Sequence, residues 1–227
     1  MKKRTTMKHW AIAISLMILG GGMSACAMGG TSWKEEVLLH DGKKIIVERS
    51  QTYGGRREIG QSPPIKEHTI SFSLPNSNKT LTFKSEFSED VGRANLNLLA
   101  LHVLNDTPYL VAEPNLCLAY NKWGRPNPPY VIFKYDGKAW QRISLSQLPA
   151  EFKAINLIVN NGREEDIQRA ASGPGYVSVA DVQHINSSLT QPEFKIILRE
   201  ALKRERCPQY SSSPKAPIPV VPSTSTK

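Results

Sequence analysis

The sequence predicts a mainly β (α+β) protein, an antiparallel hairpin-rich sheet or sandwich with a C-terminal helix. Two observations carry this prediction. Several β-prone runs come in pairs around short turns, and one apolar pattern near the C-terminus repeats at helical spacing. The chain has 227 residues, of which 40% are hydrophobic and 22% charged, so a core of normal size can form. We expect one core domain of about eight to ten strands.

Turn chemistry predicts four hairpins. Asp-Gly pairs favour the type I′ turns that join neighbouring strands, and clusters of Pro, Asn, Ser and Asp favour longer connections. One of the runs, 96–104, is mostly apolar and could instead form a short helix. The expected hairpins are 35–49 around Asp41-Gly42, 69–74 with 79–84, 96–104 with 109–112, and 130–135 with 138–143 around Asp136-Gly137.

The remaining elements are shorter. Residues 116–120 and 155–159 are apolar runs that we predict as strands, and residues 163–171 as a short helix. Residues 179–189 show no clear preference. Pro192 begins a predicted amphipathic helix that ends at Pro208, with these apolar positions at helical spacing: Phe194, Ile197, Leu198, Ala201 and Leu202.

These elements divide the chain into segments. We expect an antiparallel β domain over 34–160, followed at 161–209 by a loop-rich segment and the C-terminal helix, packed on the sheet. Residues 210–227 are rich in Ser and Pro and are predicted to be a disordered tail. A signal peptide at 1–25 and a tether at 26–33 precede the domain.

The N-terminal segment has the layout of a secretory signal. Residues 1–9 are basic, residues 10–19 are continuously apolar, and Gly20-Gly21-Gly22 then leads into small residues. The apolar run is shorter than the roughly 20 residues that a membrane-spanning helix needs. An ordinary buried helix would explain neither the basic start nor the three glycines.

Met23-Ser24-Ala25-Cys26 resembles the lipobox of bacterial lipoproteins, although Met23 stands where Leu is usual. The resemblance implies cleavage before Cys26 and a thioether-linked diacylglycerol on this cysteine. Ala27, in place of Asp, implies sorting to the outer membrane of a Gram-negative cell, with the protein facing the periplasm. The alternative is that Ala25-Cys26-Ala27 is an A-x-A site, cut after Ala27 to release a soluble protein.

The charge argues against nucleic acid as a partner. The formal net charge is +9, but Lys2, Lys3, Arg4 and Lys8 lie in the signal segment, which leaves +5 on the mature chain. The other basic residues alternate with acidic ones, whereas nucleic-acid binding needs a concentrated basic patch. Weak attraction to anionic lipid head groups remains compatible with this charge.

The number of cysteines is consistent with an exported protein. If Cys26 carries lipid, Cys117 and Cys207 remain, and an oxidising periplasm would let them pair. Such a bridge would stabilise the fold by roughly 4 kcal/mol through loop entropy. The alternative is two unpaired thiols. The absence of a C-x-x-C pair from the sequence gives no indication of a thioredoxin-like site.

The sequence predicts no catalytic residue, metal ligand or cofactor. It contains no G-x-S-x-G or S-x-x-K motif, and its histidines form no H-x-H, H-x-x-H or HExxH spacing. We interpret His40 as an exposed strand end and His102, within LLALHVL, as a hydrogen-bonded core residue.

One segment, residues 120–130, combines aromatic residues, Arg, amides and prolines between two predicted strands. Trp, Tyr and Arg are the usual anchors of binding hot spots, so we select Asn121, Trp123, Arg125 and Tyr130 as candidate binding residues. The alternative is a long connection whose Trp123 and Tyr130 fold back onto the sheet.

The mature region, through WKEEVLLHDGKKIIVERS and LCLAYNKWGRPNPPYVIFKYDGKAW, also resembles uncharacterised proteobacterial envelope proteins, which implies no activity. We therefore expect a lipid-anchored envelope protein with a binding or structural role and an envelope protein or peptidoglycan as partner. The alternative is an envelope hydrolase with a dispersed active site, acting on peptidoglycan. A third hypothesis is a subunit of a secretion or outer-membrane assembly that uses the Ser/Pro tail for reach.

Overall fold

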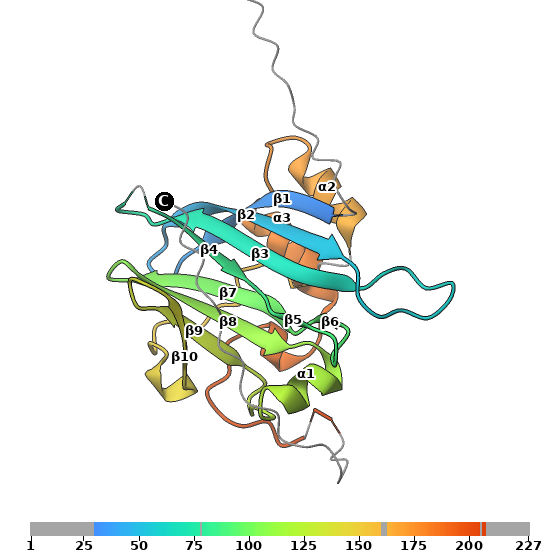
Figure 1. Ribbon diagram of the computed structural model, residues 1–227. Helices are drawn as coiled ribbons and strands as arrows, with labels where there is room; N and C mark the ends of the chain where they lie inside the picture. The colour runs from blue at the N-terminus through green and yellow to red at the C-terminus, as the bar shows by residue number, and fades with distance from the viewer. Residues whose placement is uncertain (1–29, 78, 160–162, 205, 208–227) are drawn as a thin grey trace, which may run out of the picture.

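Two four-stranded antiparallel sheets pack face to face in the computed structural model, which describes residues 30–77, 79–159, 163–204 and 206–207 (Figure 1). The mainly β prediction is confirmed. The first sheet contains, in order, β1 (Gly30–Leu38), β2 (Lys44–Tyr53), β3 (Ile65–Ser73) and β4 (Thr80–Lys84). The second contains, in the order β10-β9-β8-β7, β7 (Leu96–Leu104), β8 (Thr107–Pro114), β9 (Val131–Tyr135) and β10 (Trp140–Ile143). A small hairpin of β5 (Phe87–Ser88) and β6 (Arg93–Ala94) connects the two sheets along the chain.

The four predicted hairpins are confirmed, and each joins two strands that are consecutive in a sheet. At the first turn Asp41 Oδ1 accepts a hydrogen bond from the backbone N–H of Lys43, and Gly42 has a φ of 84°. Asp136 does the same at the fourth turn, where Gly137 has a φ of 98°. Positive φ is costly for other residues, so these two Asp-Gly pairs determine where the strands reverse.

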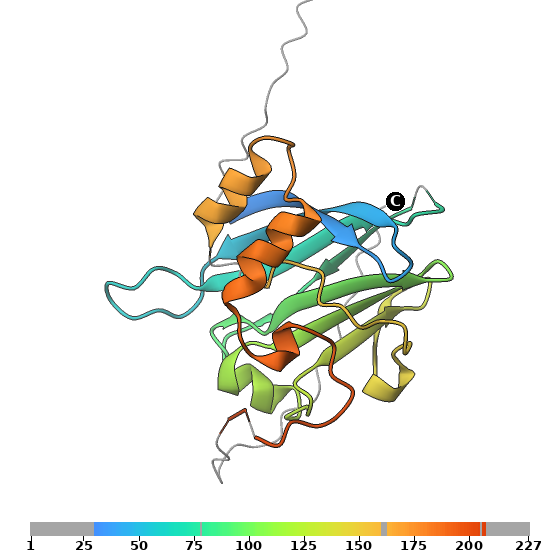
Figure 2. The same cartoon turned by 180° about the vertical axis from the view of Figure 1, so that it is seen from behind.

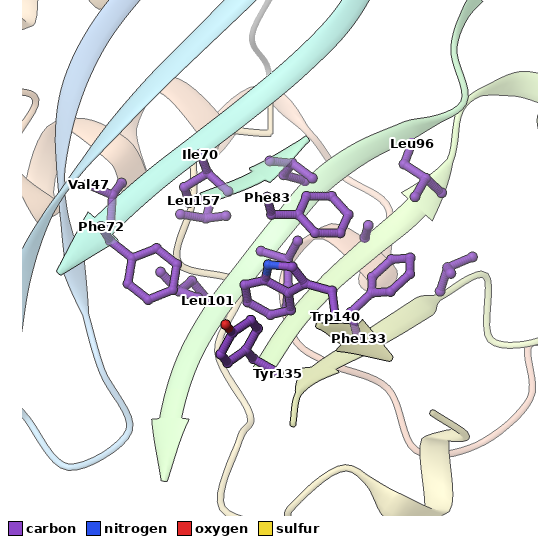
Figure 3. Packing of buried hydrophobic residues seen from close by; sticks show 14 of the residues in the cluster. Val47, Ile70, Phe72, Phe83, Leu96, Leu101, Phe133, Tyr135, Trp140 and Leu157 are labelled. Atoms are coloured by element: carbon purple, nitrogen blue, oxygen red, sulfur yellow. The ribbon is translucent and has the colours of Figure 1, made fainter. Parts of the chain in front are cut away.

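The sandwich core lies between the inner faces of the sheets (Figure 3). The first sheet supplies alternate residues such as Val47 and Phe83, as the period of two in a strand requires. The second sheet contributes aromatic rings, and the rings of Phe83 and Trp140 meet edge to face with their centroids 5.5 Å apart. Such pairs stabilise the core beyond the burial of their apolar area.

The second sheet is buried on both faces. Its outer face carries Leu99, Tyr109 and Val111, which pack against side chains from the segments 145–159 and 194–198. This double burial explains why the β7 sequence is mostly apolar on both faces rather than alternating.

Two of the predicted strands are wrong. Residues 116–120 begin helix α1 (Leu116–Lys122), in which Ala119 and Tyr120 are buried while Leu116 and Leu118 are exposed. Five apolar residues are too few to separate helix from strand by periodicity. Residues 155–159 lie outside every described strand, although 156–159 are buried, because side-chain hydrogen bonds replace a strand ladder here.

Apart from α1, the helices follow the sheets along the chain (Figure 2). The predicted helix at 163–171 is confirmed as α2 (Glu164–Ala171), and the ambiguous stretch that follows contains α3 (Val179–Ile185). Both contact β1, and they enclose a third apolar cluster with Trp33 at its centre. Single 3-10 turns occur at η1 (Leu145–Gln147), η2 (Asn186–Ser188) and η3 (Pro192–Phe194).

The predicted helix from Pro192 to Pro208 is wrong in its described part, which contains only the turn η3. Beyond η3 the backbone groups form hydrogen bonds with residues distant in sequence instead of with each other. The N–H of Ile197 donates to Lys153 O at 2.8 Å, and Ala154 forms an isolated antiparallel bridge with Ile196. Tertiary contacts therefore override the helical periodicity.

The domain boundaries also shift. The first sheet begins at Gly30, and Trp33 is buried, so residues 30–33 belong to the sheet although we predicted them as tether. The predicted signal peptide, Cys26 and the predicted tail at 210–227 lie outside the described residues.

Candidate functional site

The candidate binding segment folds back onto the second sheet. Trp123 follows α1 and is fully buried in the sandwich core, where its ring meets Phe133 edge to face with centroids 6.1 Å apart. The guanidinium group of Arg142 lies 5.4 Å from the Trp123 ring centroid and donates a hydrogen bond to Trp123 O at 3.1 Å. Trp123 therefore offers solvent no aromatic face on which a ligand could stack.

Tyr130 holds the last part of the chain, which we call the C-terminal strap (residues 192–204 and 206–207). Its hydroxyl oxygen lies 3.0 Å from Glu193 O and 3.1 Å from Ile196 O, and it accepts a hydrogen bond from Leu198 N at 3.3 Å. Burial raises the pKa of Tyr130 to about 12, so the hydroxyl keeps its proton and can donate to the strap.

Asn127 binds the strap as a strand would. Its Oδ1 accepts from Leu202 N at 2.7 Å, and its Nδ2 donates to Leu202 O at 3.0 Å. The Asn127 amide thus supplies both a donor and an acceptor, as the backbone of a neighbouring strand would. This explains how the strap is held although it is not a strand of a sheet.

The end of the strap is fixed by a disulfide and an arginine. The predicted bridge between Cys117 and Cys207 is confirmed, with their Cα atoms 5.6 Å apart. Arg125 donates to Asn121 Oδ1 at 2.6 Å and to Cys207 O at 2.5 Å, and its guanidinium group lies 5.1 Å from the Tyr120 ring centroid. The bridge thus joins the strap to α1, not to a strand.

These contacts do not bring the four candidate binding residues to one open cleft: Tyr130 and Arg125 contact the strap, Asn121 is joined to Arg125, and Trp123 lies in the sandwich core. Trp123 and Tyr130 are buried, while Asn121 and Arg125 are half-buried. The arrangement agrees with the alternative prediction, in which Trp123 and Tyr130 fold back onto the sheet.

A buried ion pair lies on the inner face of the first sheet, and we had not predicted it. Arg49 Nη1 donates to Glu35 Oε1 at 2.9 Å, and Trp33 Nε1 donates to Glu35 Oε2 at 2.8 Å. The side chains of Glu35 and Arg49 have no exposed surface, and Arg49 also lies 5.3 Å from the Trp33 ring centroid. The strand period was the available signal, because Glu35 is in phase with the core residues Trp33 and Val37.

Two neighbours complete this polar cluster. His68 is fully buried on β3, and burial, followed by the positive charge of Arg49, lowers its pKa to about 3. Gln51 on β2 donates to Glu164 Oε1 at 2.8 Å, which ties α2 to the sheet. A neutral, enclosed histidine beside a compensated ion pair is a structural arrangement, since a general base must reach its substrate.

Two other histidines, His40 and His102, lie close together at the other end of the sandwich, with ring centroids 6.4 Å apart. His102 is a hydrogen-bonded core residue, as predicted: its Nε2 lies 3.0 Å from Ala154 O, its ring stacks on Phe152, and burial lowers its pKa to about 4. His40 is not the exposed strand end that we predicted. It is half-buried because its ring packs edge-on against Phe152, with centroids 5.0 Å apart.

His40 borders a hollow of about 190 Å³ between the hairpin turns at this end. The hollow also contains Asp41 and Asp106, whose carboxylates already accept hydrogen bonds from Lys43 N and Asn76 Nδ2. The hydrogen bonds and charge of Lys43 lower the pKa of Asp41. Both carboxylates are thus occupied in holding turns.

Among the residues that the structure describes, no three His, Cys, Asp or Glu side chains gather in a way that could hold a metal ion. None of the helices in the described ranges is long and apolar enough to cross a membrane. No protein-family model matches the chain, and no curated protein or solved structure shows significant similarity to it.

Proposed function

We propose that this protein is a lipoprotein of the bacterial envelope, anchored by acyl chains on Cys26, whose β-sandwich has a binding or structural role. We further propose that it resides in the outer membrane and faces the periplasm, with peptidoglycan or another envelope protein as its partner. The carrying observation is the run from a basic start through an apolar segment to Met23-Ser24-Ala25-Cys26, immediately ahead of the first strand.

Two features of the folded part support this proposal. Because disulfides persist in oxidising compartments, the bridge between Cys117 and Cys207 is consistent with a protein that folds after export. The sheet begins only four residues after Cys26, so an anchor there would hold the sandwich close to the membrane. Stable anchoring needs more than one acyl chain, and a lipoprotein cysteine carries two or three.

The internal contacts favour a binding or structural role over a hydrolase. His68 and His102 are buried with lowered pKa values, and the carboxylates nearest to His40 hold turns. A hydrolase built on these groups would first have to open the core around them.

The proposal is tested by feeding cells an alkyne-bearing palmitate analogue and measuring the label on the purified protein. We expect the wild-type chain to be labelled and C26S to lose the label. The double variant C117S/C207S is the matched control and should keep it, because these thiols are not the predicted acylation site. An unlabelled wild-type protein, or equal labelling of C26S, would reject the anchor.

A further inference from the structure

One end of the sandwich collects the features that a membrane-facing surface needs. Gly30, the first residue of β1, pairs with Thr52 near the end of β2, so the loop that follows β2 begins beside the start of the sheet. Cys26 precedes Gly30 by four residues, which span at most about 14 Å when fully extended. A lipid on Cys26 would therefore keep this end of the sandwich near the bilayer.

The loop of residues 54–64 projects from this end with a fixed base (Figures 1 and 2). Gly54 N donates to Pro64 O at 2.9 Å, which closes the loop, and Arg56 N donates to Gly92 O at 3.1 Å. Gly55 has a φ of 88°, and a Cβ atom there would lie 2.3 Å from Gly92 O. Glycine at this position thus allows the loop to pack directly on the β5–β6 hairpin.

A tight turn presents an isoleucine at the tip. Gln61 N donates to Glu58 O at 3.1 Å, and Gly60 has a φ of 86°, which places Ile59 and Gly60 at the central positions of a turn that needs glycine second. The side chain of Ile59 is completely exposed, with a relative accessibility of 106%. Arg56 and Arg57 beside it are also exposed, and neither forms an ion pair with another described residue.

Helix α1 adds apolar surface at the same end. Leu116 and Leu118 are each more than half exposed, and both views place α1 and the 54–64 loop at the same end of the sheets. With Ile59 they are three of the six large hydrophobic side chains that the described residues expose. Exposed apolar groups next to unpaired arginines are the pattern of a surface that meets lipid head groups and the outermost acyl carbons.

We propose that this end of the sandwich rests on an anionic phospholipid surface, with Ile59 entering the head-group region and Arg56 and Arg57 contacting lipid phosphates. This inference rests on the proposed anchoring through Cys26. It assigns the orientation of the anchored protein: the hairpin turns around Asp41, Asp106 and Asp136, at the opposite end, point away from the membrane toward a partner.

The test attaches the mature chain, beginning at Cys26, to vesicles through a maleimide lipid, since the bridge leaves Cys26 as its free thiol. The vesicles contain equal parts phosphatidylethanolamine and phosphatidylglycerol, with bromine on acyl carbons near the head group. In the folded domain the native tryptophans Trp33, Trp123 and Trp140 are buried, so they give a low background. We expect the indole introduced by I59W to be quenched at least twofold more than the wild-type emission.

The matched control is K138W, which places an indole in an exposed turn at the opposite end. It should be quenched no more than wild type, and R56E/R57E should reduce the quenching of I59W in these vesicles. Equal quenching of I59W and K138W would overturn the orientation. Because the tether is chemical, this result is independent of acylation in cells: loss of palmitate labelling rejects the anchor, and absent quenching rejects the orientation.

Discussion

The hairpin region, residues 30–143, and the C-terminal region, residues 144–207, are held together in different ways. In the hairpin region each main strand pairs with a neighbour in sequence, and the turns between them carry their own stabilising residues. In the described part of the C-terminal region, side chains reach across long separations to individual backbone groups. The first region is specified locally and the second by contacts that exist only after the first has formed.

The segment at 156–159 shows this dependence most clearly. Leu157 enters the sandwich core, Ile158 the cluster under α2 and α3, and Val159 the cluster on the outer face of the second sheet. Asn156 completes the junction by bonding Leu101 N at 2.9 Å, Leu101 O at 2.8 Å and Leu38 O at 2.9 Å. Three consecutive residues thus join three apolar clusters, with one amide satisfying the adjoining backbone.

The largest expected effect follows from removing that amide. N156A leaves two buried backbone groups of Leu101 and the part-buried carbonyl of Leu38 without this partner, at roughly 1–3 kcal/mol each, so we expect a loss of about 4 kcal/mol in the free energy of unfolding. Urea unfolding measures it. The control is N76A, whose exposed bond to Asp106 lies between two hairpin turns and should change stability by less than about 0.5 kcal/mol. An equal loss of stability in N156A and N76A would contradict the claim that long-range side-chain contacts stabilise the C-terminal region more than turn contacts stabilise the hairpin region.

Removing the disulfide tests whether the order of the strap depends on the bridge at Cys207, its last described residue. The bridge closes a loop across 90 positions in the unfolded chain, and measured effects usually fall below the roughly 4 kcal/mol of the loop-entropy model, so we expect C117S/C207S to lose about 3 kcal/mol of stability. Hydrogen exchange should accelerate at Ile197 and Leu202 in the strap, while the amides of β2 and β3 remain protected. Uniform loss of protection in both sheets would show that the strap is part of one cooperative unit with the hairpins.

The buried histidines give each region a pH probe. His68 lies within the hairpin region, whereas His102 is bonded to Ala154 of the C-terminal region, and their pKa values are lowered to about 3 and about 4. A lowered folded-state pKa means that the unfolded chain binds protons first. Stability should therefore be unaffected above pH 6.5 and fall as the pH drops toward 4, by about 1.4 kcal/mol per pH unit for each histidine.

Urea unfolding between pH 7 and pH 5 measures this slope. H102Q keeps a side-chain donor near Ala154 and removes one titrating ring, so we expect the slope to fall by half. An unchanged slope would mean that the His102 ring is protonated or solvated in the folded protein. The buried carboxyl of Glu113 acts with opposite sign, since burial raises its pKa. Because the wild type and H102Q share Glu113, the difference between their slopes isolates the contribution of His102.

The smallest expected effect concerns Tyr130. Y130F keeps the buried ring and removes the hydroxyl that contacts the strap at Glu193, Ile196 and Leu198, so we expect a loss of about 1 kcal/mol. The sheet should keep its near-ultraviolet spectrum while exchange at Leu198 accelerates. A loss of ligand binding without any change in strap exchange would instead support the predicted recognition role of Tyr130.

The hairpins could be predicted because their information is local. Asp41-Gly42 and Asp136-Gly137 mark their own turns, and alternation within strands of the first sheet, such as β2, indicates the buried face. The prediction failed where an element is defined by distant contacts. The periodic residues after Pro192 would suit a helix, but the backbone N–H groups of Leu202 and Leu198 donate to Asn127 and Tyr130 instead of to helical carbonyls.

The candidate site shows the same limit. Trp123, Arg125 and Tyr130 were selected as binding residues from their types, but residue type alone does not distinguish an exposed anchor from a side chain that packs inside the fold. The ion pair of Glu35 and Arg49 was missed because charged residues within a strand normally indicate the wet face. Their shared phase with Trp33 and Val47 was the signal that places them inside.

The anchor on Cys26 is the premise for both the cellular location and the orientation of the sandwich. The most direct test is the mass of the N-terminal peptide from protein purified out of the membrane fraction. The account predicts a peptide that begins at Cys26 and carries two or three acyl chains. A peptide that begins at unmodified Met28, or an intact chain that still begins at Met1, would contradict it.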